Sequence, residues 1–316
     1  MSTSGTVIQR TAIGLGIPAS TLRRLSNTAP HRYKVYAIPK RSGRGMRIIA
    51  QPAKEVKAVQ RWLVENELTW MPLHSAAAAY VKGASIRENA LLHLPNRFLL
   101  KTDFKDFFPS IKESDLCAHI NRFGPSRYSR DEVEFLCRML LWRPRPGPLE
   151  LCIGAPSSPF LSNTVMHDFD VAVIAHCAQL GVRYSRYADD LAFSTNTPNV
   201  LHSLPGYIQA ELLNLAYPRL QLNDQKTVRS SRKFRRSVTG LVLANQGYVS
   251  LGRERKRLIS AMLHRFVKGG LSEEERMRLA GLLSFVHDVE PTFLQRLERR
   301  YTVGMVVLAR RSPRRP

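Results

Sequence analysis

Hydrophobic and polar positions change their spacing several times along the chain, and each spacing predicts a different element. Residues 33–36 and 47–50 are rich in strand-forming side chains and flank a turn-like segment, which predicts a β-hairpin. In residues 53–68 the apolar side chains recur with helical spacing, which predicts an amphipathic helix. Residues 97–111 begin with a short apolar run, which predicts a buried strand that ends at Asp103. The first third of the chain is therefore expected to mix helices and strands.

The second half of the chain changes from strands to basic helices. The stretch YSRYADDLAFS (184–194) alternates around a tight turn, which predicts a second hairpin. Residues 220–243 end in two strand-rich pieces around Gly240. Beyond Arg253 the chain is predicted to be helical and strongly basic, with one apolar face. That face is expected to contain Leu258, Met262 and Phe266, which follow helical spacing.

The charge balance indicates a polyanionic partner. Lys and Arg number 48 against 25 Asp and Glu, which gives a formal net charge of +23. An excess of this size is typical of nucleic-acid-binding proteins, although a generally basic surface would give the same count. A membrane partner is disfavoured, because no long basic amphipathic helix with a Trp, Phe or Leu face stands out and the most apolar run is too short to span a bilayer.

Cysteine usage and the N-terminal sequence favour a cytoplasmic protein. The four cysteines show no CxxC pair and no ligand-like spacing, so they are expected to be reduced, packed thiols. The first eleven residues contain no apolar core and do not resemble a signal peptide. We therefore expect a soluble, intracellular protein.

Two adjacent aspartates, Asp189 and Asp190, stand at the predicted tip of the second hairpin. Like charges at this range repel, so one pKa should rise unless a cation lies between them. Alone, the pair is better explained as an exposed acidic turn. Asp103 is also expected at a strand end, however, and a strand end can converge with a hairpin tip. Three carboxylates in so basic a protein would bind two Mg²⁺ ions, which activate a hydroxyl and stabilise leaving pyrophosphate in phosphoryl transfer.

Five short motifs occur in the order of the reverse transcriptase sequence blocks. They are TDFKDFFPSI, GAPSSP, YADDLAFS, LNDQKT and VTGLVL. Two further segments, ENALLH and SVTGL, resemble the short signatures that mark retron reverse transcriptases among their bacterial relatives. The signature residues are Asn89, Ala90, His93, Val238, Thr239 and Gly240. The chain thus resembles a retron reverse transcriptase over nearly its whole length.

The resemblance implies a fold class and a division of the chain. The fold is expected to be α+β, in the right-hand arrangement of polymerases. Fingers and palm are expected in residues 1–245, and a basic helical thumb and tail in residues 246–316. The composition shift near residue 245 is the one credible boundary in the sequence.

The motifs also imply roles for individual residues. Asp103, Asp189 and Asp190 match the catalytic aspartates and become the metal ligands. Phe108 matches the aromatic residue that lies under the sugar and excludes a ribose 2′-hydroxyl, a steric form of specificity. The alternative is that Phe108 is a core residue beside Phe107.

A nucleotide-binding set is implied next to the metal ligands. Arg47 matches the fingers position that holds the triphosphate, and Asp106 is expected to shape the turn around the triphosphate through backbone N–H groups. Lys226 matches a lysine that can protonate or neutralise pyrophosphate, although a surface lysine is the alternative. Gly154 of the GAPSSP block completes the set. The basic neighbours of Arg47 are Lys40, Arg41 and Arg44.

One departure from the family pattern lies directly before Gly154. The family usually has Pro-Gln there, and this chain has Cys152 and Ile153. The glutamine normally touches the nucleotide sugar and the template stack. Because Ile153 cannot form a side-chain hydrogen bond, nucleotide affinity or discrimination is expected to differ, while catalysis is retained.

Primer and RNA contacts are implied in two regions. Gly240 matches a β-turn that grips the primer end, where glycine permits close backbone approach. Asn89 and His93 match a retron signature and are expected RNA contacts, with a packed histidine as the alternative for His93. The thumb is expected to offer a basic helical face to an RNA hairpin. The basic residues at its start are Arg253, Arg255, Lys256 and Arg257.

The resemblance implies an RNA-directed DNA polymerase with defined partners. Members of the family bind their own structured non-coding RNA, prime from a guanosine 2′-hydroxyl and copy part of that RNA from dNTPs. The branched RNA–DNA product (msDNA) stays bound, and the complex commonly acts in anti-phage defence with an effector protein. The alternatives are a reverse transcriptase of the group II intron or diversity-generating type, a viral-type RNA polymerase and a catalytically idle RNA-binding scaffold. The two retron signatures count against the group II intron and diversity-generating types. Phe108 counts against a viral-type RNA polymerase, and the intact aspartates count against an idle scaffold.

Overall fold

The computed structural model describes residues 5–40 and 45–311 and divides the chain into two compact units. The first unit consists of Met1–Gly83, Lys101–Ala192 and Asn199–Thr227, and the second consists of Ala84–Leu100, Phe193–Pro198 and Val228–Pro316. Both units contain helices and strands, so the predicted α+β class is confirmed. The boundary expected near residue 245 stays a prediction.

Three helices near the N-terminus of the first unit pack around apolar side chains. They are α1 (Val7–Leu15), α2 (Ala19–Thr28) and α3 (Lys54–Trp62), and α3 continues into a π-helical turn, Leu63–Glu67. The side chain of Thr6 and that of Gln9 form a capping box that satisfies free N–H groups at the start of α1. The predicted apolar face of residues 53–68 is confirmed, because Val56 and Val59 are buried.

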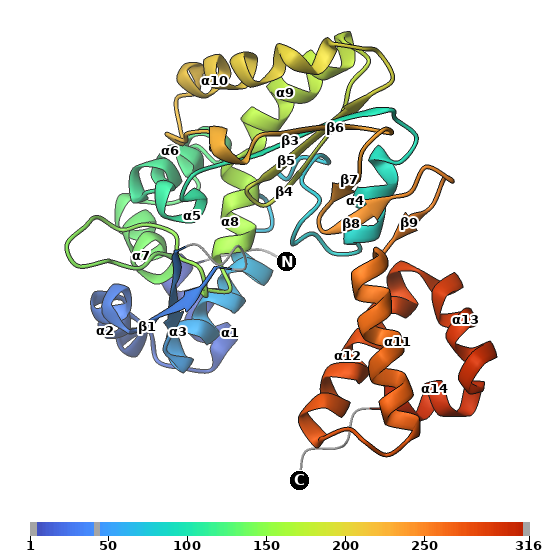
Figure 1. Ribbon diagram of the computed structural model, residues 1–316. Coiled ribbons are helices and arrows are strands. Elements are labelled where there is room, and N and C mark those ends of the chain that lie inside the picture. The colour runs from blue at the N-terminus through green and yellow to red at the C-terminus, as the bar shows by residue number, and fades with distance from the viewer. Residues whose placement is uncertain (1–4, 41–44, 312–316) are drawn as a thin grey trace. The chain divides into compact units, whose positions relative to one another are not determined.

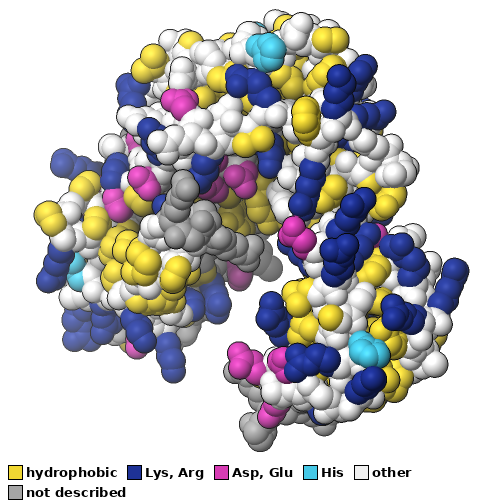
Figure 2. Space-filling view, in the orientation of Figure 1, with side chains coloured by type: hydrophobic (Ala, Val, Ile, Leu, Met, Phe, Trp, Pro, Cys, Tyr) yellow, Lys and Arg dark blue, Asp and Glu magenta, His cyan; other side chains and the backbone are white. Residues whose placement is uncertain are grey.

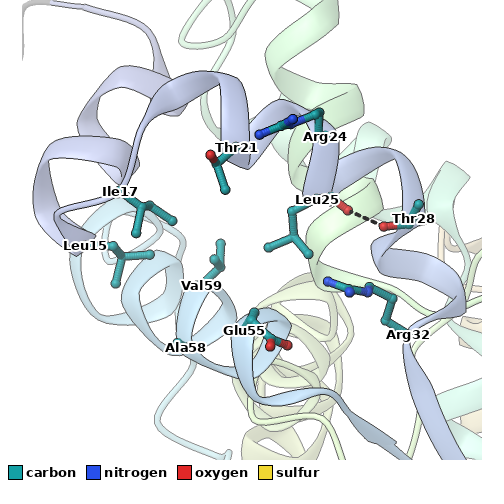
Figure 3. A pocket seen from close by; sticks show the side chains of 10 residues that line it. All are labelled: Leu15, Ile17, Thr21, Arg24, Leu25, Thr28, Arg32, Glu55, Ala58 and Val59. Atoms are coloured by element: carbon teal, nitrogen blue, oxygen red, sulfur yellow. Dashed lines mark hydrogen bonds between the residues drawn. The ribbon is translucent and has the colours of Figure 1, made fainter.

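An apolar cavity of about 500 Å³ lies between these helices. In Figure 3 the side chains of Ile17, Leu25 and Val59 point toward its interior. No residue predicted to bind metal, nucleotide or RNA belongs to its lining. The cavity is therefore separate from the predicted chemistry.

The first predicted hairpin is confirmed. β1 (Tyr33–Pro39) pairs antiparallel with β2 (Met46–Pro52), and Tyr33 stands opposite Pro52. Ala50 of β2 is buried against Cys152 and Ala155, which fixes the base of the hairpin. Two of the turn residues expected to contact the triphosphate, Arg41 and Arg44, lie outside the described residues.

A four-stranded sheet carries the second predicted hairpin. Its strand order is β4-β5-β3-β6, and β3 and β5 contribute residues to both units. The bounds are β3 (Phe98–Asp103), β4 (Arg183–Tyr187), β5 (Asp190–Thr195) and β6 (Val228–Ser231). Both expectations are confirmed: one strand ends at Asp103, and residues 184–194 form a hairpin.

Helices of the first unit support the strands of this sheet. Figure 1 shows α9 (His167–Gln179) close to β4, with which it packs. Phe169 of α9 is fully buried, and its ring centroid lies 5.6 Å from that of Phe104, the residue after Asp103. The other helices of this unit are α5 (Phe107–Ser110), α6 (Glu113–Phe123), α7 (Arg130–Leu140), α8 (Ser158–Val165) and α10 (Leu204–Asn214), with 3₁₀ turns at Ala29–His31, Val200–His202 and Asp224–Lys226.

The second unit begins with a helix packed on a small sheet. α4 (Ile86–His93) contacts the antiparallel strands β7 (Arg236–Val238) and β8 (Leu241–Leu243), and β8 also pairs with β9 (Val249–Ser250). The two strand-rich pieces predicted around Gly240 are therefore confirmed. They form a tight hairpin whose turn consists of Thr239 and Gly240.

Four helices follow this small sheet. They are α11 (Arg253–Val267), α12 (Glu273–Val289), α13 (Pro291–Tyr301) and α14 (Val303–Arg310). The helical prediction is confirmed, and of the predicted apolar face of α11 Met262 is buried and Phe266 half-buried, but the prediction for Leu258 is wrong. Leu258 is 39% exposed, and the buried positions are Ile259, Met262 and Leu263. Packing against α12 and α14 turns the helix by one position from the face that spacing alone favoured.

Basic side chains are prominent on these helices. In Figure 2 Lys and Arg side chains are spread over α11–α14, with hydrophobic side chains between them. Among residues 5–40 and 45–311, no helix is both long enough and apolar enough to cross a bilayer.

Candidate active site

The end of β3 and the tip of the β4–β5 hairpin meet through the backbone. The N–H of Phe104, directly after Asp103, donates to the carbonyl oxygen of Asp189 at 3.2 Å. On its other side the Asp103 carbonyl accepts from the N–H of Asn223 at 2.8 Å. Asp103 is only 3% exposed. The predicted approach of a strand end to a hairpin tip is therefore present in the structure.

The hairpin tip has an unusual backbone. Ala188 and Asp189 form the turn between β4 and β5, and Ala188 has a φ of +57°. A residue with a Cβ in this left-handed region costs roughly 1–2 kcal/mol relative to an ordinary conformation. The surrounding structure must therefore stabilise the turn that carries the two aspartates.

A lysine partly neutralises this acidic group. Lys226 Nζ forms an ion pair with Asp103 Oδ2, and this hydrogen bond raises the pKa of Lys226. The other carboxylate oxygen, Asp103 Oδ1, is buried and has no hydrogen-bond partner among the described residues. Because a buried acceptor without a partner is costly, Asp103 Oδ1 is suited to a cation.

The role of the three carboxylates as metal ligands stays a prediction. Within the described ranges, no three Asp, Glu, His or Cys side chains are grouped tightly enough to hold a metal ion as they stand. Lys226 pairs with one oxygen of Asp103, and like charges at close range repel, so a cation would stabilise this group of carboxylates.

The charges of neighbouring aspartates help to raise the pKa values of Asp189 and Asp190. Loss of hydration, together with the charges of Asp189 and Asp103, raises the pKa of Asp190 to about 6. Loss of hydration also raises the pKa of Asp189, with the charge of Asp103 adding to the effect. Lys101 and Lys226 oppose the shift at Asp190. Because like charges at close range repel, this group of carboxylates is stabilised when it binds either protons or a cation.

Phe107 and Phe108 face different environments. Phe107 is 3% exposed and stacks on Phe104 with ring centroids 5.5 Å apart. Phe108 is half-buried, with its ring 5.4 Å from that of Phe107. Of the two aromatic residues, Phe107 is therefore the core residue, and Phe108 keeps an accessible surface.

A tight turn precedes these rings. Asp106 is exposed and has a φ of +41°, and its carbonyl accepts from both the N–H and the hydroxyl of Ser110. The Asp106 side chain makes no capping hydrogen bond to α5. The Asp106 carbonyl therefore stabilises this turn, while the predicted role of the backbone N–H groups toward a triphosphate stays a prediction.

The GAPSSP segment lies against β2. The N–H of Ala50 donates to the carbonyl of Ile153 at 2.9 Å. Gly154 has a φ of +122°, and a Cβ placed there would lie 2.8 Å from the Ala50 carbonyl oxygen. Glycine is required at this position by both conformation and space. Cys152 and Ile153, the residues that depart from the family pattern, thus anchor the hairpin base.

Arg47 extends the site along β2. Its side chain is exposed, and its positive charge lowers the pKa of Asp189 and of Tyr80 against the effect of burial. Lys40, its neighbour in the same hairpin, directs its backbone N–H to the carbonyl of Gly45.

Tyr80 is a site residue that sequence reasoning missed. It is 55% exposed, has a φ of +61° and lies with its ring 6.4 Å from that of Tyr187. Partial loss of hydration raises the pKa of Tyr80, and the nearby charge of Asp189 contributes. The available signal was a single aromatic residue at the end of an alanine run, AAAAY.

In the second unit, the predicted retron-signature residues are largely internal. Asn89 is 5% exposed and His93 is fully buried, with its Nδ1 2.8 Å from Ser194 Oγ. Thr239 and Gly240 have φ values of +49° and +79°, which is the type I′ turn of a two-residue hairpin. The Thr239 hydroxyl donates to the Ile86 carbonyl at 3.3 Å, so the turn is held against α4.

The basic residues at the start of α11 differ in their surroundings. Arg253 and Arg257 are exposed. Lys256 instead pairs with Glu290, whose side chain is 2% exposed. Arg255 lies over the ring of Phe285, 5.4 Å from its centroid. Arg253 and Arg257 are therefore the more accessible of the four predicted RNA contacts.

Comparisons with known proteins agree with the sequence motifs. Residues 38–243 match the family described as "Reverse transcriptase (RNA-dependent DNA polymerase)". The chain is 41% identical over 278 residues to the Retron Ec83 reverse transcriptase of Escherichia coli, with 87% of this chain and 88% of that protein covered. It is 32% identical over 286 residues to the Retron Ec73 reverse transcriptase of the same species, with coverages of 86% and 88%. With the Retron Ec86 reverse transcriptase, also from Escherichia coli, it shares 31% identity over 293 residues, with coverages of 90% and 87%.

Proposed function

The chain belongs to the retron reverse transcriptase family and is an RNA-directed DNA polymerase, and we propose that it copies part of its own structured RNA into DNA that stays joined to that RNA. Its fold is the right-hand polymerase fold of the family. The observation that carries the proposed site is the backbone hydrogen bond from Phe104 to Asp189, which brings Asp103 to the Asp189–Asp190 tip. An idle scaffold would not need this convergence.

Asp103, Asp189 and Asp190 are the proposed ligands of two Mg²⁺ ions. Carboxylate oxygens are the ligands that Mg²⁺ prefers, and Asp103 Oδ1 is a buried acceptor that lacks a partner among the described residues. Bound Mg²⁺ supplies activation of the attacking hydroxyl and stabilisation of the leaving pyrophosphate. Lys226 pairs with Asp103 Oδ2, and its proposed role is to neutralise the leaving pyrophosphate.

The reaction joins a hydroxyl oxygen to the α-phosphorus of a dNTP. The bond between the α-phosphorus and the bridging oxygen breaks, pyrophosphate leaves, and the hydroxyl loses its proton. In the first cycle the proposed hydroxyl is the 2′-hydroxyl of a guanosine in the RNA; in later cycles it is the 3′-hydroxyl of the growing DNA. Arg47 holds the triphosphate, while Asp106 and Gly154 shape the backbone around it. Phe108 presents its accessible ring to the sugar.

RNA recognition is proposed for the second unit. Exposed Arg253 and Arg257 would contact phosphates, with Arg255 and Lys256 also placed on α11. The Thr239–Gly240 turn would approach the primer end. Because Asn89 and His93 are buried, we propose that they shape the RNA-binding surface from beneath rather than contact bases widely. Phosphate contacts alone bind any RNA, so choice of the cognate RNA requires additional contacts to loop bases.

The similarity to retron reverse transcriptases extends the proposal to the cellular role of the protein. We propose that the RNA–DNA product remains bound and that the complex acts in anti-phage defence with a separate effector protein. The cellular test of the whole proposal is to purify the chain from its natural host and sequence the nucleic acid that remains bound. We expect one RNA species and DNA complementary to a contiguous part of it. A random sample of cellular RNA without DNA would contradict the proposal.

The metal proposal predicts a pH-dependent release of protons. At pH 6 about half of the Asp190 side chains carry a proton in metal-free protein, because the pKa is raised to about 6. A metal ligand must be deprotonated, so Mg²⁺ binding should release protons near pH 6 and almost none at pH 8. Titration calorimetry in two buffers of different ionisation enthalpy measures this release.

The matched control for this measurement is Asp190→Asn. This variant has no titrating group at position 190 and should lose most of the release at pH 6. Equal release at both pH values, or an unchanged release in Asp190→Asn, would contradict the assignment. The same raised pKa of Asp190 determines how the stability of the folded protein changes with pH. The contribution of Asp190 to stability is fully present below its ordinary pKa of 3.8 and is lost as the pH rises through about 6.

A further inference from the structure

A fully buried ion pair lies next to the turn that carries Asp189. Arg186 of β4 and Asp170 of α9 have no exposed surface. Arg186 Nε donates to Asp170 Oδ1 at 2.9 Å, and Nη2 donates to Oδ2 at 2.6 Å. The Tyr184 hydroxyl also donates to Asp170 Oδ1 at 2.8 Å. A buried ion pair of this kind does not by itself show that the pair stabilises the fold. Apolar residues of similar volume at the same positions often stabilise a fold equally well or better.

The remaining Arg186 nitrogen reaches the catalytic turn. Nη1 donates to the carbonyl oxygen of Ala188 at 3.2 Å and to Asn163 Oδ1 at 3.1 Å. Ala188 is the left-handed residue directly before Asp189. Apolar replacements of the ion pair would fill the same space but would leave this buried carbonyl without its donor.

Asn163 extends the network to Tyr80. Its side-chain amide, itself 1% exposed, donates to the carbonyl of Ala79 at 2.7 Å. Ala79 directly precedes Tyr80, the other non-glycine left-handed residue beside Asp189. The backbone of Arg186 also bonds this segment, accepting from the Ala78 N–H at 2.7 Å. One buried network thus donates hydrogen bonds to the carbonyl of Ala79, next to Tyr80, and to that of Ala188, and both Tyr80 and Ala188 have positive φ.

We propose that Asp170, Arg186 and Asn163 are positioning residues of the polymerase site. They hold the Ala188–Asp189 turn and the Tyr80 segment in the arrangement that the reaction requires. This inference rests on the proposed site at Asp103, Asp189 and Asp190. Its consequence is specific: loss of the network slows nucleotide addition more than it weakens the binding of primer–template or dNTP, because misplacement of a reacting group acts on the chemical step.

Two substitutions separate the parts of the network. Asn163→Leu keeps a similar volume but removes the donor to Ala79 and the acceptor for Arg186. Arg186→Lys keeps the positive charge beside Asp170 but removes the guanidinium group that donates to Asp170, Asn163 and the Ala188 carbonyl. The matched control is Glu67→Gln, which breaks the Arg10–Glu67 ion pair elsewhere in the first unit. The Glu67 carboxylate is also buried, and it makes no hydrogen bond to the YADD turn.

The test combines rate, thermal and exchange measurements. The rate of dTTP addition is measured on poly(rA) annealed to oligo(dT) with Mg²⁺, over a range of dTTP concentrations up to saturation. We expect both network variants to lose about 100-fold in maximal rate, with KM for dTTP changed less than about threefold. Glu67→Gln should show a comparable drop in Tm without this loss of rate. In metal-free protein, hydrogen exchange of residues 79–81 and 187–190 should accelerate in the network variants and not in Glu67→Gln.

The outcomes distinguish this inference from the proposed function. Network variants that match Glu67→Gln in both maximal rate and exchange would overturn the positioning role. If Arg186→Lys fails to fold, Asn163→Leu decides the question alone. If wild-type protein adds no nucleotide while the exchange differences appear, the proposed polymerase site is refuted and the positioning of the two turns is supported.

Discussion

Asp189→Asn is expected to reduce DNA synthesis by at least about 1,000-fold, which corresponds to about 4 kcal/mol of transition-state stabilisation. The substitution removes a charged oxygen ligand from the proposed metal site while keeping the size of the side chain. The second unit, which carries the proposed RNA contacts, is left unchanged. Synthesis is measured as dTTP incorporation on poly(rA)–oligo(dT), and RNA binding as retention of the co-purifying RNA.

Asp168→Asn is the matched control for this prediction. Asp168 is a partly exposed aspartate of α9 whose carboxylate pairs with Arg122 at 2.7 Å. The same chemical change there should leave synthesis within about twofold, because an exposed ion pair contributes at most about 1 kcal/mol and makes no contact with the reacting groups. Residual synthesis in Asp189→Asn within tenfold of wild type would contradict the metal assignment.

Phe108→Val is expected to admit ribonucleotides. If the Phe108 ring lies under the sugar as proposed, its replacement by a shorter side chain opens space for the 2′-hydroxyl, and the ratio of kcat/KM for dNTP to that for rNTP should fall by about 100-fold. The use of dNTP should fall less than the use of rNTP rises. Steady-state incorporation of dTTP and UTP on the same primer–template measures both efficiencies.

Phe107→Leu provides the control for this substitution. Phe107 is buried and stacks on Phe104, so its truncation should lower Tm by removing core contacts. It should not change the choice between dNTP and rNTP. If Phe108→Val shifts only stability, or if both variants shift the ratio equally, Phe108 is a core residue and the sugar gate lies elsewhere.

The sequence predicted the elements that local pattern controls. Alternation around a turn identified the 184–194 hairpin, and a short apolar run identified the strand that ends at Asp103. Two residues with positive φ form the tight β7–β8 turn at Thr239 and Gly240. In each case the period of the side chains or the turn chemistry depends on neighbouring residues, so it can be read from the sequence.

Side-chain partners between distant segments could not be predicted in this way. The Lys226–Asp103 pair joins residues 123 positions apart, so no local pattern in the sequence indicates it. The buried face of α11 is shifted by one residue, because packing against other helices selects among neighbouring apolar positions. His93 occupies an internal position that a short motif cannot distinguish from a surface one.

The chemistry of the linkage between RNA and DNA in the co-purified nucleic acid tests the central claim most directly. RNase digestion followed by mass spectrometry of the DNA 5′ end reports this linkage. We predict that the DNA keeps a ribonucleotide remnant joined through the 2′ oxygen of one guanosine, and that protein carrying Asp189→Asn yields the same RNA without DNA. DNA with a free 5′ end, or branched DNA formed in the Asp189→Asn variant, would contradict the account.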